Sequence, residues 1–174
     1  SLALGVTPFG DGYRAGVRIA RGDMTGDGVA DLITVTGPRV AARVRVWDGA
    51  TAAMIVDLDP FPGYYGGLWV AAGDMNADGT ADIAVGTDLG NLPHVKVLNG
   101  RGQGELASFY AYAPGFLGGV RVGMGDLNGD GPPIWGAKGA DIVSIIDDKT
   151  YVSAKDGPTY DRLAIMDPVS GEIT

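Results

Sequence analysis

Short runs of alternating hydrophobic and polar residues recur three times along the chain, each time in the same order. Every recurrence starts with an alternating apolar pair, and these pairs are Val17/Ile19, Leu68/Val70 and Val120/Val122. Alternation with a period of two is typical of a β-strand that buries one face. We therefore expect each recurrence to open with a strand.

Three further strands follow in each unit. The second strands are predicted at DLITV, DIAVG and DIVSII, the third at VRVWDG, VKVLNG and LAIMDP, and the fourth at AAMIVDL and ELASFYAY. Asp48-Gly49 and Asn99-Gly100 are expected to supply the left-handed conformations of tight hairpins. Aromatic, glycine-rich return loops (PFPGYYGG and APGFLGG) lead into the next unit. Four antiparallel strands per unit predict an all-β fold of β-propeller blades, with a sandwich of repeated hairpins as the alternative.

The repeat has a constant length. The segments 15–31, 66–82 and 118–131 align without gaps, and their first aspartates, Asp23, Asp74 and Asp126, are 51 and 52 residues apart. We predict one repeat region over residues 1–174, with blade units at about 15–65, 66–117 and 118–174. Residues 1–14 are expected to be an outer strand of an incomplete blade and its return loop.

Composition narrows the classes of function. Thirty glycines and ten prolines disfavour a helical protein. No apolar run approaches the roughly 18 residues that a membrane-spanning helix needs, so we expect no membrane insertion. A net charge of -8 argues against a nucleic-acid surface. With one histidine and no cysteine, the chain has little with which to build hydrolytic or zinc chemistry, and we expect no enzyme.

Each unit carries an acidic loop between its first two strands. Oxygen-bearing side chains occupy positions 1, 3, 5 and 9 of the loop, glycine occupies position 6, and position 7 offers a carbonyl. Such a pattern suits Ca²⁺, which prefers six to eight hard oxygen ligands. The predicted ligands are Asp23, Thr25, Asp27, Val29 and Asp31 in the first loop, Asp74, Asn76, Asp78, Thr80 and Asp82 in the second, and Asp126, Asn128, Asp130 and Asp141 in the third.

The same residues also build Asx-type turns without any metal. We favour calcium because three carboxylates within nine residues repel one another unless a cation lies between them. An EF-hand is excluded because strands flank the loops and position 12 is not acidic. In the third loop the insertion PPIWGAKGA separates Gly131 from Asp141, which displaces the position-9 ligand. For this loop the sequence favours neither calcium binding nor a metal-free turn.

The sequences GDMTGDGVADLITV, GDMNADGTADIAVG and GDLNGDG, together with LPHVKVLNG and FYAYAPGFLGGVRV, resemble the FG-GAP repeats of integrin-alpha-type β-propellers, closest to the bacterial secreted and surface type. The resemblance covers about the first 131 residues. It implies a blade fold with calcium in the hairpin between the first two strands, bound by the side chains at positions 1, 3, 5 and 9. It also implies an extracellular or cell-surface location, with roles that range from adhesion to enzyme scaffolds.

The chain departs from this pattern after Gly131. Residues 132–140 and 147–161 are interpreted as insertions in the last blade, the second of them lying before a third strand at 162–166. That assignment leaves the outer strand of the last blade to begin near residues 171–174.

Three units are fewer than the roughly four to eight blades of a closed propeller. Residues 2–6 of one copy are expected to complete the last blade of the next, giving a ring or a filament. The alternative is a fragment of a longer propeller. We thus predict a calcium-binding extracellular structural or adhesion protein that self-associates head to tail or binds other surface proteins. A propeller segment that binds carbohydrate or protein, within a larger surface protein or enzyme, is the alternative function.

Overall fold

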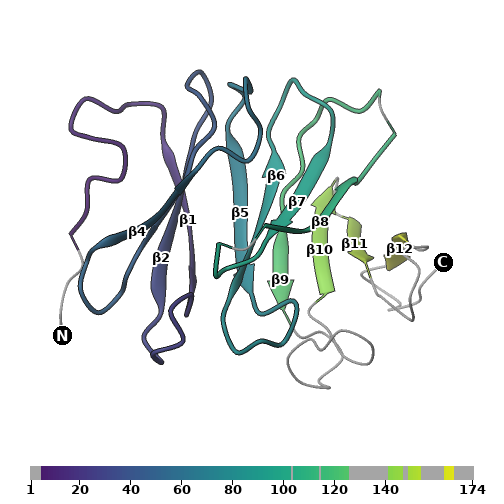
Figure 1. Ribbon diagram of the computed structural model, residues 1–174. Helices are drawn as coiled ribbons and strands as arrows, with labels where there is room; N and C mark the ends of the chain where they lie inside the picture. Colours follow the sequence, from purple (N-terminus) through teal and green to yellow (C-terminus); the bar gives the residue numbers. More distant parts are fainter. Residues whose placement is uncertain are drawn as a thin grey trace.

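The computed structural model describes residues 5–102, 104–113, 115–125, 141–146, 149–153 and 163–166. Within these ranges all regular secondary structure is β-strand, and the strands form three four-stranded antiparallel sheets (Figure 1). The prediction of an all-β fold is confirmed.

In each sheet the strands lie side by side in chain order. The first sheet consists of β1 (Val17–Gly22), β2 (Asp31–Thr36), β3 (Val44–Trp47) and β4 (Met54–Leu58). The second consists of β5 (Leu68–Gly73), β6 (Asp82–Thr87), β7 (His94–Leu98) and β8 (Glu105–Tyr110). The third consists of β9 (Gly123–Gly125), β10 (Asp141–Ile146), β11 (Lys149–Ser153) and β12 (Leu163–Met166).

The first strand of each sheet lies next to the first strand of the following one. β1 contacts β5, and β5 contacts β9, so the sheets follow one another along the chain with their first strands adjoining (Figure 1). This is the arrangement of consecutive blades in a partial β-propeller.

The third sheet corrects two sequence predictions. Residues 149–153 pair with both β10 and β12, so they form the third strand, and LAIM is the fourth strand and not the third. The interpretation of 147–161 as an insertion is therefore wrong for residues 149–153. It arose because the Asp-Pro after LAIM was equated with the Asp-Gly and Asn-Gly that follow the third strands of the other units. The first strand, β9, also begins later than Val120, at Gly123.

The prediction for the two chain ends changes accordingly. An outer strand is already present in the last blade as β12, and residues 171–174 lie outside the described range. At the other end, residues 5 and 6 form no strand within this single chain and residues 2–4 lie outside the described range, so pairing of residues 2–6 with another copy stays a prediction.

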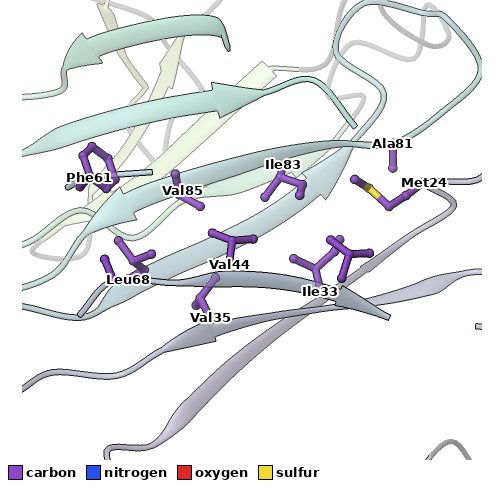
Figure 2. Close-up of a cluster of buried hydrophobic side chains, with 11 residues drawn as sticks. Met24, Ile33, Val35, Val44, Phe61, Leu68, Ala81, Ile83 and Val85 are labelled. Atoms are coloured by element: carbon purple, nitrogen blue, oxygen red, sulfur yellow. The ribbon is translucent and has the colours of Figure 1, made fainter. Parts of the chain in front are cut away.

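The largest buried cluster lies between the first two sheets (Figure 2). Because successive side chains of a strand point to opposite faces, alternate residues of β2 and β3 point toward the second blade. Ile33, Val35 and Val44 are fully buried against Leu68 and Val85 of that blade. Burying each such side chain contributes about 1.5–3 kcal/mol, which holds the blades together.

A stack of charged and aromatic side chains also joins the blades. Arg18, Trp69 and Arg121 occupy equivalent positions in the three units. The guanidinium carbons of Arg18 and Arg121 lie 3.8 and 4.8 Å from the centre of the Trp69 ring. Arg18 also donates to the Leu68 carbonyl at 2.6 Å and pairs with Asp88. These contacts fix β1 against β5.

Candidate functional site

The two described acidic loops occupy equivalent places in neighbouring blades. The first loop, residues 23–31, joins β1 to β2, and the second loop, residues 74–82, joins β5 to β6. Each begins directly after a residue paired across the hairpin, since Gly22 lies opposite Asp31 and Gly73 opposite Asp82. The hairpin register therefore fixes both ends of each loop.

The aspartate at position 9 of each loop is buried, with exposed fractions of 1% for Asp31 and 0% for Asp82. Asp31 accepts hydrogen bonds from the amides of Met24 (2.8 Å), Thr25 (3.1 Å) and Gly49 (2.8 Å). The carboxylate of Asp82 likewise accepts from two amides. These aspartates tie the start of the loop to the turn between the third and fourth strands of the same blade.

The two turn glycines bound by these aspartates are required for a reason that the sequence analysis did not give. Gly49 and Gly100 do not have the predicted left-handed conformation; in the first turn it is Ala52 that has it, with φ of 62°. A Cβ on Gly49 would lie 2.2 Å from the Ala30 carbonyl oxygen, and one on Gly100 would lie 1.7 Å from that of Ala81. Glycine is needed because the turn packs against the loop backbone.

Asp82 shows what burial does to a carboxylate at this position. It accepts hydrogen bonds from the amides of Met75 at 2.8 Å and Gly100 at 2.9 Å. Burial is the largest influence and raises the pKa of Asp82 above its ordinary value, although the two amide donors oppose it. The nearby carboxylates of Asp74 and Asp78 raise it further.

The aspartate at position 1 is surrounded by amides of its own loop. Asp23 accepts from the amides of Gly26 (2.6 Å), Asp27 (3.2 Å) and Gly28 (2.7 Å). The Gly28 amide is the main reason why the pKa of Asp23 lies below its ordinary value. Asp74 accepts from the Asp78 amide at 3.2 Å and the Gly79 amide at 2.9 Å.

Left-handed backbone conformations at positions 4 and 6 allow this wrapping. The position-6 glycines, Gly28 and Gly79, have φ of 83° and 86°. At position 4, Gly26 has φ of 77°, whereas the second loop places Ala77 there with φ of 54°. The bend predicted for glycine at position 6 is present, and a similar bend occurs two residues earlier.

The carboxylates at position 5 differ between the loops. Asp27 accepts one hydrogen bond among the described residues, from the Val29 amide to Oδ1 at 2.8 Å. Asp78 accepts from the Thr80 amide (2.9 Å), the Thr80 hydroxyl and the Asn76 amide group (3.2 Å). Burial alone would raise the pKa of Asp78, but these hydrogen bonds and the neighbouring Arg101 outweigh it and hold that pKa below its ordinary value.

The predicted ligands thus share one loop in each blade without converging on one point. Among the described residues, no three acidic or histidine side chains gather as a ready metal cage. The hydrogen bonds in both loops are those of the Asx-turn alternative. Asp126, Asn128 and Asp130 lie outside the described residues, and Asp141 begins β10 just as Asp31 begins β2. Calcium binding by these residues stays a prediction.

Met24 is a site residue that the sequence analysis missed. It occupies position 2 of the first loop, is 4% exposed and packs with Ala81 of the second loop (Figure 2). Beside it, the Ala81 amide donates to the Asp23 carbonyl at 2.7 Å. The available signal was the apolar residue at this position in all three loops, namely Met24, Met75 and Leu127.

Arg101 is the second residue that the sequence analysis missed. It follows the turn glycine of the second blade and reaches the second loop. Its guanidinium donates to the Asp78 carbonyl at 2.9 Å and to the Thr80 hydroxyl at 3.3 Å, and its Nε lies 3.7 Å from Asp78 Oδ2. A cation is therefore already present at one of the two loops.

Comparison with known families agrees with this geometry. Residues 66–107 match the family model of the FG-GAP repeat, a stretch that contains the second loop, β5, β6 and β7. FG-GAP repeats are propeller repeats, typically non-catalytic and found mostly in extracellular or surface proteins. In the part of the chain that the structure describes, no helix has the length and apolar character needed to cross a bilayer.

Proposed function

We propose that this FG-GAP repeat protein is a calcium-binding, non-enzymatic structural or adhesion propeller of the extracellular space or cell surface. The observation that carries the proposal is the repetition of one loop, with the same backbone restraints, at the same place in two neighbouring blades. The carboxylates at positions 1 and 5 of that loop lie partly or fully exposed, where a cation has access.

The donors of the first loop suit calcium chemically. Asp23, Thr25 and Asp27 supply hard oxygens, and Val29 adds a backbone carbonyl. A carboxylate offers about four acceptor sites, so Asp27 keeps its bond to the Val29 amide and still has room for a metal. Bound calcium would neutralise the repulsion between these exposed carboxylates. Asp31 holds the loop backbone in place, whether or not it also binds the ion.

The second and third loops offer the corresponding donors. Asp74, Asn76, Asp78, the Thr80 carbonyl and Asp82 form the second set, and Asp126, Asn128, Asp130 and Asp141 form the third. In the second set Asp74 accepts only two hydrogen bonds among the described residues, which leaves acceptor capacity for an ion.

Calcium titration of the purified chain tests this function. We expect calcium, and not an equal concentration of magnesium, to raise the melting temperature, because a ligand at 100 times its Kd stabilises the folded state by about 2.7 kcal/mol. Asp27→Ala should remove one site from the stoichiometry measured by calorimetry. Asp11→Ala, which removes an aspartate outside the loops, should not. Equal stoichiometry in both variants, or no response to calcium, would contradict the proposal.

We also propose that the chain self-associates. A strand from another copy does not complete the last blade in this proposal, because β12 already occupies the outer position of that blade. The observation that supports self-association is the exposed face of β1. Val17 and Ile19 are 40% and 63% exposed, whereas their equivalents Leu68 and Val70 pack against the first blade. Light scattering of the eluting protein, in calcium and after chelation, should show a species larger than the monomer, and Ile19→Asp should reduce it. A monomer at all concentrations would contradict self-association.

A second candidate function, binding of carbohydrate or protein, is favoured by a pocket between the first two blades. Its volume is about 350 Å³, and Phe61, Tyr64, His94 and Lys96 are among the residues that line it. The His94 ring lies 5.1 Å from Phe61 and 4.7 Å from Tyr110, which gives an aromatic surface with polar groups beside it. Glycan or protein binding that is lost in His94→Ala would favour this function.

A further inference from the structure

We propose that Arg101 acts as a resident cation of the second loop and lowers its affinity for calcium, so that the first loop binds calcium at lower concentration. This inference rests on the proposed calcium function. It begins with the contacts of Arg101, whose guanidinium binds the Asp78 carbonyl and the Thr80 hydroxyl and lies beside the Asp78 carboxylate. Asp78 is a predicted ligand, so Arg101 and calcium compete for the same group.

The first blade lacks this cation at the equivalent position. Gly49 and Gly100 both donate to the position-9 aspartate of their own blade, which makes the two turns structurally equivalent. The next residue donates its amide to the preceding turn side chain at 2.8 Å in both cases, from Ala50 to Asp48 and from Arg101 to Asn99. Ala50 therefore stands where Arg101 stands.

The carboxylates of the first loop have no such partner elsewhere in the described part of the chain. Neither Asp23 nor Asp27 forms an ion pair with a lysine or arginine there, and Asp27 is exposed where Asp78 is half-buried. Without a cation, the first loop has only hydrogen bonds from its own hydroxyl and amide groups to offset the charge.

The effect on calcium follows from electrostatics. A guanidinium within about 4 Å of a ligand oxygen offsets part of the negative charge that attracts calcium and repels the incoming ion. The guanidinium must also leave Asp78 before the carboxylate can turn fully to the metal. We expect the two effects together to separate the calcium midpoints of the two loops by about tenfold or more.

The two loops consequently respond differently to calcium. Arg101 already neutralises part of the charge of the second loop, which keeps its shape without metal. The first loop keeps its full negative charge until the ion binds. Changes in calcium concentration should then act on the first loop before the second, although the same motif forms both.

Amide NMR during a calcium titration reads each loop separately. The Gly28 amide donates to Asp23 and the Gly79 amide donates to Asp74, so each reports on its own loop. In the wild-type chain the Gly28 signal should shift at a calcium concentration about tenfold lower than the Gly79 signal. Arg101→Ala should lower the Gly79 midpoint about tenfold and leave Gly28 unchanged, whereas Ala50→Arg should raise the Gly28 midpoint.

Arg39→Ala is the control for net charge, since the exposed Arg39 side chain forms no hydrogen bond or ion pair with the described residues. It should leave both midpoints in place. If Gly79 shifts at the same calcium concentration in wild type and Arg101→Ala, the inference is overturned while calcium binding stands. If neither glycine responds to calcium in any variant, the proposed calcium function and this inference both fail.

Discussion

The first and second loops have the same backbone frame and different charge environments. In both, a buried aspartate receives the amide of a turn glycine, and an aspartate at position 1 receives the amides of its own loop. Only the second loop has a guanidinium beside its position-5 carboxylate. The comparison teaches that the motif determines the shape of the loop, while a residue about twenty positions away, outside the motif, determines whether a positive charge lies beside it.

The strongest test of the shared frame is a methyl group at each turn glycine. Gly49→Ala and Gly100→Ala both place a Cβ inside the contact distance of a backbone carbonyl, and both disturb the amide that the buried aspartate receives. We expect each to lower the free energy of unfolding by about 2–4 kcal/mol in urea denaturation. Gly115→Ala, which meets nothing within 4 Å, is the control. If only one of the two substitutions lowered the free energy of unfolding, the two turns would not be structurally equivalent.

An exchange at position 4 gives a smaller effect with opposite signs in the two loops. Ala77 has a left-handed backbone that costs a residue with a Cβ about 1 kcal/mol, and Gly26 has nearly the same backbone without that cost. Ala77→Gly should stabilise the protein by up to about 1 kcal/mol, and Gly26→Ala should destabilise it by about as much. Thermal unfolding in chelator measures both. Equal signs would show that the two loops are not equivalent at this position.

The smallest expected difference lies in the response to acid. Because the folded-state pKa of Asp23 is lowered, this group stabilises the fold above its ordinary pKa, and the stabilisation is lost as the pH falls through the folded pKa. Asp82 has a raised pKa, so its contribution is fully present below the ordinary value and is lost as the pH rises through the folded pKa.

Carboxyl-carbon NMR checks this order directly. On acidification in chelator, Asp82 should take up its proton first, above the ordinary aspartate range, and Asp23 and Asp78 should do so below that range. If Asp82 instead took up its proton after Asp23 and Asp78, the amide donors, and not burial, would dominate the pKa of Asp82.

Much of the frame was readable from the sequence because it depends on local patterns. Alternation and turn residues located the strands of the first two blades, and glycine at position 6 marked the bend at Gly28 and Gly79. The third strand of the last blade was missed because the Asp-Pro after LAIM was equated with the turns that follow the third strands of the other blades, whereas LAIM is a fourth strand. β11 itself carries the threonine, tyrosine and valine typical of a strand.

The missed features of the site depend on contacts that a local pattern does not contain. Whether Arg101 points to solvent or to Asp78 depends on the packing of its turn against the loop, and the same packing decides why Gly100 is needed. The carboxylate at position 9 likewise binds amides of two segments that the fold brings together, and only one of these lies in the motif.

The burial of Met24 has a consequence for how such a chain can be divided. Its side chain packs against the second blade, and the Asp23 carbonyl beside it receives an amide from the second loop. The boundaries of the sequence repeat therefore differ from those of the packed unit, which includes part of the neighbouring loop. Deleting one sequence repeat would remove half of two interfaces, so a transplantable module must carry the neighbouring loop with it, and blades joined in this way should melt together and not one at a time.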